Sequence, residues 1–198
     1  KKPLKAKFYG TDKKKMLLHN EEEVKEILAK LENAEYQVCD VKKGERVKKA
    51  PLPFTTSTLQ QEASKVLNFS TQKTMRIAQQ LYEGVDIKGS GTTGLITYLR
   101  TDSTRISEEA DASVKAYIGE VYGEQYVTQV EETKKSDGKN IQDAHEAIRP
   151  SDVTRTPASV KDSLSRDQFR LYQLIWKRFV ASRMQPARYE TTSIRIGA

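Results

Sequence analysis

The fold of the middle of this chain is decided by one segment, Ser165-Arg-Asp-Gln-Phe-Arg-Leu-Tyr-Gln-Leu-Ile-Trp-Lys-Arg-Phe-Val180. Ser165 and Gln168 have the spacing of a capping box, so the segment predicts a helix that begins there and ends at Met184 and Pro186. Large apolar residues lie on one broad face of this helix: Phe169, Tyr172, Trp176, Phe179 and Val180. A face of this kind packs into a core, and we expect the other helices of the chain to surround it.

Two shorter helices precede this one, after the boundary that Pro51-Leu52-Pro53 predicts. Ser57 or Thr58 is predicted to cap a helix that reaches Leu67, and Thr71 a second helix that ends at Gly84. Two short helices joined by a brief turn are typical of a helix-turn-helix. The further predictions are a loop over 85–93, a short strand over 94–98, a helix capped by Ser107, and a surface loop over 131–140.

Strands are predicted at both ends of the chain. The alternation of Leu4–Tyr9 predicts one, and a second around Tyr36–Val41 should close at the turn Lys42-Lys43-Gly44. Asn20 should cap a helix between them, and Thr191–Ala198 reads as a last strand. Strands that flank a helical middle predict an α+β fold. Because the chain opens without Met and closes on a strand with no partner after it, we expect a segment of a longer protein.

Composition narrows the class of protein. The chain has 198 residues with 34 Lys and Arg against 27 Asp and Glu, a net charge of +7, which favours a nucleic-acid partner. No apolar run approaches the roughly 20 residues of a membrane-spanning helix. The single cysteine, Cys39, excludes an internal disulfide and a cysteine-based zinc site, and we expect a cytoplasmic protein.

The stretch Gly94-Leu-Ile-Thr-Tyr-Leu-Arg-Thr-Asp-Ser-Thr104 brings a nucleophile and a cation together. A phenol, with a reference pKa of about 10, attacks poorly unless its phenolate is stabilised or its proton removed. Arg100 could stabilise the phenolate of Tyr98 while binding two phosphate oxygens. The alternative is a buried tyrosine beside a structural ion pair between Arg100 and Asp102.

A second stretch, Gln142-Asp-Ala-His-Glu-Ala-Ile-Arg-Pro150, places His145 among acidic and basic neighbours. A histidine near a phosphate can donate a hydrogen bond or move a proton near neutral pH. The alternative is a histidine that is only hydrogen-bonded in place. No histidine pair or Asp-x-Asp cluster with ligand spacing occurs, so we expect no metal site within the chain.

Three motifs together resemble bacterial type IA DNA topoisomerase I: Pro53-Phe-Thr-Thr-Ser-Thr-Leu-Gln-Gln61, Ile96-Thr-Tyr-Leu-Arg-Thr-Asp-Ser-Thr104 and Ala144-His-Glu-Ala-Ile-Arg-Pro-Ser151. The resemblance runs from about Pro51 to the C-terminus. It implies a winged-helix-like domain over 53–181, inserted into a β-rich arch domain formed by 1–52 and 182–198. The whole enzyme would relax negative supercoils by cleaving one DNA strand, passing another through the break and resealing it.

The resemblance also implies roles for single residues. Tyr98 would be the nucleophile that becomes joined to a 5′ phosphate, Arg100 would position that phosphate, and His145 would lie near the DNA backbone. Asp102 would orient Arg100 or the tyrosine, or contact DNA. The further DNA contacts implied by these motifs are Thr97, Ser103 and Arg149. Mg²⁺ would be bound by acidic residues of a TOPRIM domain upstream of Lys1, outside this chain, and the expected partners are DNA and the enzyme's other domains.

Two other functions compete with this interpretation. A winged-helix DNA-binding module without chemistry explains the charge and the helix-turn-helix, but it leaves the tyrosine–arginine motif unexplained. A tyrosine recombinase or type IB enzyme also combines Tyr, Arg and His. Its nucleophile follows its arginines, whereas Tyr98 precedes both Arg100 and His145.

Overall fold

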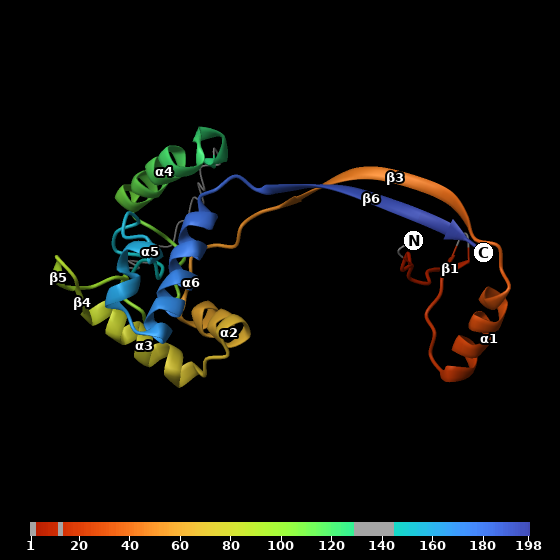
Figure 1. Ribbon diagram of the computed structural model, residues 1–198, viewed down its shortest axis with the longest axis horizontal. Coiled ribbons are helices and arrows are strands. Elements are labelled where there is room, and N and C mark those ends of the chain that lie inside the picture. Colours follow the sequence, from red (N-terminus) through yellow and green to blue (C-terminus); the bar gives the residue numbers. More distant parts are fainter. Residues whose placement is uncertain (1–2, 12–13, 129–144) are drawn as a thin grey trace, which may run out of the picture. The chain divides into compact units, whose positions relative to one another are not determined.

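The structure is a computed structural model that describes residues 3–11, 14–128 and 145–198 (Figure 1). The chain divides into two units, unit 1 (Lys1–Val47 and Arg188–Ala198) and unit 2 (Lys48–Ala187). Helices occur together with small two-stranded sheets, so the α+β prediction is confirmed. The predicted domain limits, 52/53 and 181/182, differ from these unit limits by a few residues.

Unit 1 contains one helix and short sheets. Helix α1 (Glu21–Glu32) begins as predicted, because the Asn20 side chain accepts the Glu23 N–H at 2.9 Å. Strands β1 (Gly10–Thr11) and β2 (Lys14–Lys15) pair with each other, and the long strand β3 (Gln37–Lys48) pairs with β6 (Ala187–Gly197).

Two predictions for unit 1 are wrong. Residues 3–9 form no strand, because alternation alone gives a strand only where a partner supplies hydrogen bonds. The turn at Lys42-Lys43-Gly44 is also wrong, since β3 continues through it. A Cβ on Gly44 would lie 3.4 Å from the Thr191 hydroxyl of β6. The pairing with β6, which is remote in sequence, therefore prevails over the local turn preference of these residues.

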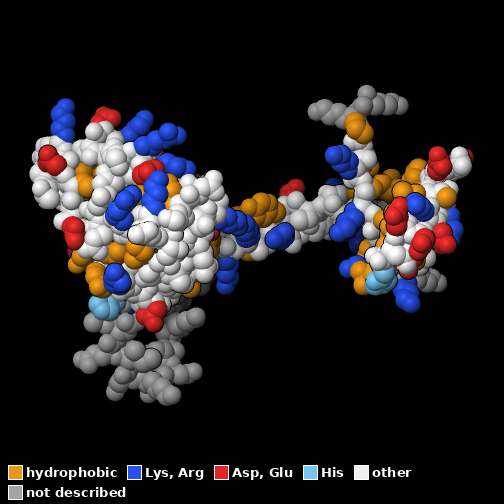
Figure 2. All heavy atoms as spheres, turned by 90° about the horizontal axis from the view of Figure 1, so that it is seen from below, with side chains coloured by type: hydrophobic (Ala, Val, Ile, Leu, Met, Phe, Trp, Pro, Cys, Tyr) orange, Lys and Arg blue, Asp and Glu red, His pale blue; other side chains and the backbone are white. Residues whose placement is uncertain are grey.

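The described residues of unit 1 include no buried side chain. Figure 2 shows hydrophobic side chains at its surface, between lysines and arginines. The large exposed ones in this unit are Leu4, Phe8, Tyr9, Met16, Leu17, Val24, Leu28, Tyr36, Val38, Val41, Val47, Tyr189 and Ile194. In the described residues, unit 1 is therefore held by helix capping and strand pairing, while the hydrophobic core lies in unit 2.

Unit 2 is mainly helical. Its long helices are α2 (Thr56–Leu67), α3 (Thr71–Glu83), α4 (Glu108–Tyr122) and α6 (Arg166–Ser182), with α5 (Pro157–Val160) and two 3₁₀ turns, η1 (Glu124–Tyr126) and η2 (Lys161–Ser163). Strands β4 (Val85–Ile87) and β5 (Gly91–Thr93) form a hairpin. None of the described helices has the length and apolar character that a membrane span requires.

The predicted helices of unit 2 are confirmed, with corrections at their ends. Helix α2 is capped by Thr55 and not by Ser57 or Thr58, because Thr55 and Thr58 form a reciprocal capping box. Ser70 caps α3, one residue before the predicted Thr71, and α6 ends at Ser182, before Met184. The predicted loop 85–93 is the β4–β5 hairpin, and 94–98 contains only an isolated bridge from Ile96 to Pro150. The predicted loop 131–140 lies outside the described residues.

Helix α6 forms the centre of the core, as its apolar face predicts. The predicted capping box of Ser165 and Gln168 is present. Two buried aromatic residues of α6 donate hydrogen bonds to backbone carbonyls of the loop before α5. The Tyr172 hydroxyl donates to the Arg155 carbonyl at 2.6 Å, and Trp176 Nε1 donates to the Val153 carbonyl at 2.9 Å. Burial raises the pKa of Tyr172 far above its usual value. These bonds fix loop 151–156 to the core.

Candidate active site

The segment that contains Tyr98 is folded back onto the end of α3. The Leu95 N–H donates to the Leu81 carbonyl at 2.8 Å, although an entire hairpin separates them in sequence. A Cβ on Gly94 would lie 2.8 Å from the Tyr82 carbonyl oxygen, which is closer than packing allows. Glycine at position 94 therefore permits the close approach that brings Tyr98 to α3.

Exposure alternates residue by residue from Tyr98 to Ser103. Leu99, Thr101 and Ser103 are buried, whereas Tyr98, Arg100 and Asp102 are exposed. Side chains that alternate in this way lie on opposite faces of a strand-like segment. The phenol of Tyr98, which is 39% exposed, therefore shares an outer face with the Arg100 guanidinium.

The hydroxyl of Thr56, at the start of α2, holds this segment from one side. It donates to the Leu99 carbonyl at 2.7 Å and accepts the Thr101 N–H at 2.9 Å. The Thr56 N–H also donates to the Thr101 carbonyl at 2.8 Å. One side chain of α2 thus fixes the backbone on both sides of Arg100.

Thr97 ties the same segment to residues 145–150. Its hydroxyl donates to the Ala147 carbonyl at 2.8 Å and accepts the Arg149 N–H at 3.0 Å. The Thr97 N–H donates to the Arg149 carbonyl at 3.0 Å. These bonds connect the two motifs that the sequence analysis singled out, and they bring His145 to Tyr98.

Three aromatic rings meet at the outer face. The centroids of Tyr98 and His145 lie 5.4 Å apart with the rings tilted by 34°, and those of Tyr98 and Tyr82 lie 5.5 Å apart in an edge-to-face arrangement at 67°. Sequence reasoning missed Tyr82 as a neighbour of Tyr98, because the contact depends on the close approach at Gly94.

Arg100 and Asp102 form no ion pair with each other. Both side chains are exposed, and within the described parts of the chain neither makes a hydrogen bond or an ion pair. The alternative of a buried tyrosine beside a structural Arg100–Asp102 pair is therefore wrong. His145 is likewise exposed and makes no hydrogen bond to any described residue, so it is not a histidine merely fixed in place by hydrogen bonds.

The other predicted site residues use their polar groups within the chain. Ser103 is buried, and its hydroxyl accepts the Arg105 N–H at 3.2 Å. The Arg149 guanidinium pairs with Glu146 through Nη2 at 2.6 Å and donates from Nη1 to the Pro150 carbonyl at 3.0 Å. Together with Thr97, these residues hold the site from inside, and their contact with DNA stays a prediction.

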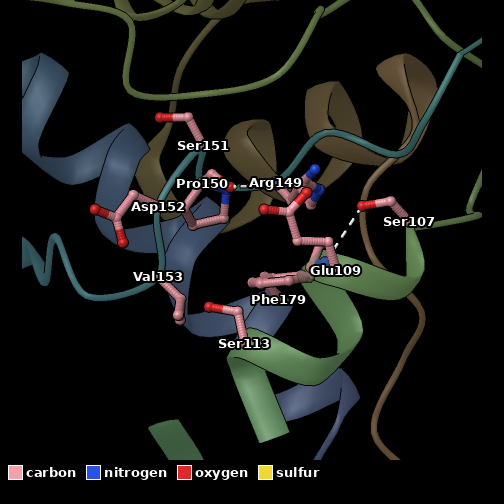
Figure 3. A pocket seen from close by; sticks show the side chains of 10 residues that line it. Ser107, Glu109, Ser113, Arg149, Pro150, Ser151, Asp152, Val153 and Phe179 are labelled. Carbon is pink, nitrogen blue, oxygen red and sulfur yellow. Dashed lines mark hydrogen bonds between the residues drawn. The ribbon is translucent and has the colours of Figure 1, made fainter. Parts of the chain in front are cut away.

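A pocket of about 280 Å³ lies between the first turns of α4 and residues 149–153 (Figure 3). Neither Tyr98, Arg100 nor His145 lines it. Its lining includes Glu109 and Asp152 beside Arg149, so the pocket is not suited to a phosphate. Among the residues that the structure describes, no three His, Cys, Asp or Glu side chains converge as metal ligands.

Comparison with known proteins decides the family. A sequence profile of the DNA topoisomerase family matches residues 3–198. The chain belongs to the bacterial type IA DNA topoisomerases. The solved structure of full-length topoisomerase I from Thermotoga maritima is similar to this topoisomerase chain, with 44% sequence identity and a TM-score of 0.73. The similarity covers 93% of this chain and 28% of the Thermotoga chain. Type IA membership excludes the recombinase and type IB interpretations.

Proposed function

We propose that this chain carries the DNA-cleaving tyrosine of a type IA topoisomerase, and that Tyr98 is the nucleophile. The observation that supports the proposal most directly is the outer face itself. The phenol of Tyr98 is partly exposed, and the guanidinium of Arg100 is exposed two residues later. The exposed imidazole of His145 has its ring centroid 5.4 Å from that of Tyr98. These groups occur together in a chain that matches the DNA topoisomerase family.

The proposed reaction is a transesterification that needs no outside energy source. The Tyr98 oxygen loses its proton and attacks a backbone phosphorus, forming a phosphotyrosyl bond to the 5′ phosphate. The bond from phosphorus to the 3′ oxygen of the preceding nucleotide breaks, and that oxygen takes up a proton. In the reverse step the 3′ hydroxyl loses its proton and attacks the phosphorus, the bond from phosphorus to the Tyr98 oxygen breaks, and that oxygen takes up a proton, which restores both Tyr98 and the strand.

Arg100 and His145 are proposed to act on the phosphate. A guanidinium offers two parallel donors to phosphate oxygens and stabilises the charge that develops on them. The imidazole of His145 can donate to another oxygen or carry a proton between the reacting oxygens. Asp102, on the same exposed face, is proposed to orient Arg100 once DNA is bound.

Relaxation of negative supercoils by strand passage is proposed for the whole enzyme, since the chain spans only 28% of the length of its Thermotoga relative. We propose that its partners are single-stranded DNA and further domains of the same enzyme, including a TOPRIM domain. The described residues provide no set of ligands for Mg²⁺, so no step of the reaction is assigned to a metal held by this chain.

Replacement of Tyr98 by Phe tests the proposal in the intact topoisomerase that contains this segment. Tyr98→Phe should abolish the covalent protein–DNA adduct, because it removes only the attacking oxygen. Affinity for a single-stranded oligonucleotide should change little, since phosphate contacts dominate it. Tyr122→Phe is the matched control, because Tyr122 is a similarly exposed tyrosine at the end of α4, where its ring contacts Tyr117.

The adduct is measured on denaturing gels with an end-labelled oligonucleotide. A Tyr98→Phe protein that still forms it would exclude Tyr98 as the nucleophile. A wild-type protein that binds DNA but never forms it would favour the non-catalytic winged-helix module.

A further inference from the structure

Tyr82 lies where α3 ends, next to the proposed nucleophile. It is the penultimate residue of the helix, it is 39% exposed, and its ring meets the Tyr98 ring edge-to-face. Its hydroxyl makes no hydrogen bond to any residue that the structure describes. Among the described residues, Tyr82 therefore contacts Tyr98 through its ring and not through its hydroxyl.

The ring of Tyr98 has few other constraints. Its own hydroxyl makes no hydrogen bond within the described residues, and more than a third of the side chain is exposed. The backbone beneath it is firmly tied by Thr56 and Thr97, but those bonds do not fix the rotation of a phenol about its side-chain bonds. Ring contacts with Tyr82 and His145 restrict that rotation.

Tyr82 is well placed to act as a fixed support. Its neighbour Leu81 is fully buried, and the Leu81 carbonyl accepts the Leu95 N–H. Helix α3 ends at Glu83, and the N–H of its C-cap residue Gly84 donates to the Gln80 carbonyl at 3.1 Å. The backbone of the last turn of α3 is thus bonded to the segment of Tyr98, so the Tyr82 and Tyr98 rings project from backbone positions that are fixed relative to each other.

We propose that Tyr82 is a positioning residue that holds the Tyr98 ring in the orientation from which its oxygen attacks DNA. This inference rests on the proposed function of Tyr98 as nucleophile. The edge of one ring against the face of the other is a favourable electrostatic arrangement with a preferred angle. A nucleophile held near its attack geometry reacts faster than one that samples several rotamers.

The expected effect falls on the chemical step and not on DNA binding. Loss of one aromatic pair should slow cleavage by about three- to tenfold at saturating DNA. Tyr82→Leu removes the ring, whereas Tyr82→Phe keeps the ring and removes only the hydroxyl. We therefore expect the Leu variant to be slow and the Phe variant to cleave at the wild-type rate.

The test uses the intact topoisomerase and single-turnover cleavage of an oligonucleotide at saturating concentration, with the dissociation constant measured separately by fluorescence anisotropy. Tyr122→Leu is the control, because Tyr122 is 44% exposed, ends α4 and makes an edge-to-face contact with Tyr117. The expected result is slow cleavage by Tyr82→Leu alone, with unchanged affinity and melting temperature in all three variants.

Wild-type cleavage by Tyr82→Leu overturns the inference, and so does equal slowing by Tyr82→Phe, which would assign the effect to the hydroxyl. If Tyr82→Leu lowers the melting temperature, Tyr82→Met is compared in the same way, and an unfolding defect in both shows that Tyr82 only supports the fold. Failure of the proposed function is seen separately, because it appears as adduct formation by Tyr98→Phe.

Discussion

The guanidinium of Arg100 is exposed and forms no hydrogen bond or ion pair within the described residues, although Asp102 is only two positions away. No described residue accepts a hydrogen bond from this guanidinium, so its N–H groups are available to a phosphate. The backbone on both sides is fixed by Thr56, so the side chain starts from a defined position. These features favour Arg100 as a binding group for the scissile phosphate.

Arg100→Lys tests whether geometry matters as well as charge. Loss of one preorganised contact to a reacting oxyanion costs about 10²–10³ in rate. Lysine keeps the charge but not the planar pair of donors, so the variant should stay clearly slower than wild type. Arg76→Lys, on the exposed surface of α3, is the control in the same single-turnover assay. Full activity of Arg100→Lys would rule out bidentate binding.

At the residue scale, the sequence predicted which chemical groups lie in the motif but not which way they face. Exposed and buried residues alternate from Tyr98 to Ser103, so that Tyr98 and Arg100 face outward and Ser103 faces inward. This alternation arises within the segment itself. The inward bonds of Thr97 and Arg149 could not be predicted, since they join segments about fifty residues apart. The contact of Tyr82 depends on the same kind of long-range approach.

At the scale of elements, three of the five predicted helix caps were correct, and the caps of α2 and α3 were misplaced by one to three residues. Asn20, Ser107 and Ser165 each cap the helix that follows them, because a side-chain oxygen satisfies an N–H only a few residues ahead. Strands were poorly predicted, because their hydrogen bonds come from distant segments. The β3 strand runs through an apparent turn, and the 94–98 segment bonds to 147–151 through one isolated bridge and single hydrogen bonds.

Thr56→Val tests the connection between α2 and the Tyr98 segment. Valine keeps the shape of the side chain but leaves the Thr101 N–H without its acceptor, which should lower the free energy of unfolding by about 1–3 kcal/mol. Thr56→Ser keeps the hydroxyl and should lose much less. Denaturant unfolding of both variants measures the difference. Equal stability of the Val variant and wild type would show that this hydroxyl does not hold the segment.

Tyr172→Phe tests how α6 holds the loop before α5. The hydrogen bond to the Arg155 carbonyl is lost, and the free energy of unfolding should fall by about 1 kcal/mol at neutral pH. Burial raises the pKa of Tyr172 in the folded state. The unfolded state therefore loses this proton first, and the contribution of Tyr172 to stability is present below pH ~10 and declines above it.

The pH dependence is checked by thermal unfolding at neutral and alkaline pH. The difference in stability between wild type and Tyr172→Phe should shrink as the pH rises above ~10, since phenylalanine has no proton to lose. A difference that is constant with pH would show that Tyr172 is not protected from ionisation in the folded state.

At the scale of the whole molecule, the two units differ in how much hydrophobic surface they bury. Unit 2 has a continuous core around α6, whereas unit 1 keeps residues such as Leu17, Leu28 and Tyr36 exposed. The sequence predicted strands at both ends and helices between them, which is the order observed. It did not predict this contrast, because α1 has the amphipathic pattern of a helix that packs on a core, yet it buries none of its residues.

The last prediction concerns the chain on its own. It holds the proposed nucleophile and phosphate-binding arginine, but in its described residues no group accepts a hydrogen bond from the Tyr98 hydroxyl and no acidic cluster could hold Mg²⁺. Phenols are mostly protonated at neutral pH. With a net charge of +7 the chain should bind single-stranded DNA weakly, and binding should weaken as salt rises. It should neither cleave that DNA nor relax a supercoiled plasmid, with or without Mg²⁺.

A cleavage assay at low salt with the purified chain decides this, and Tyr98→Phe is the control for adducts that do not depend on the nucleophile. Addition of the proposed TOPRIM domain as a separately purified piece should restore cleavage only if the two pieces bind each other, and analytical sedimentation measures that binding beforehand. Tyr98-dependent cleavage by the chain alone would mean that the group that removes the phenol proton lies within these 198 residues. His145, whose ring already lies against Tyr98, would then be the first residue to replace.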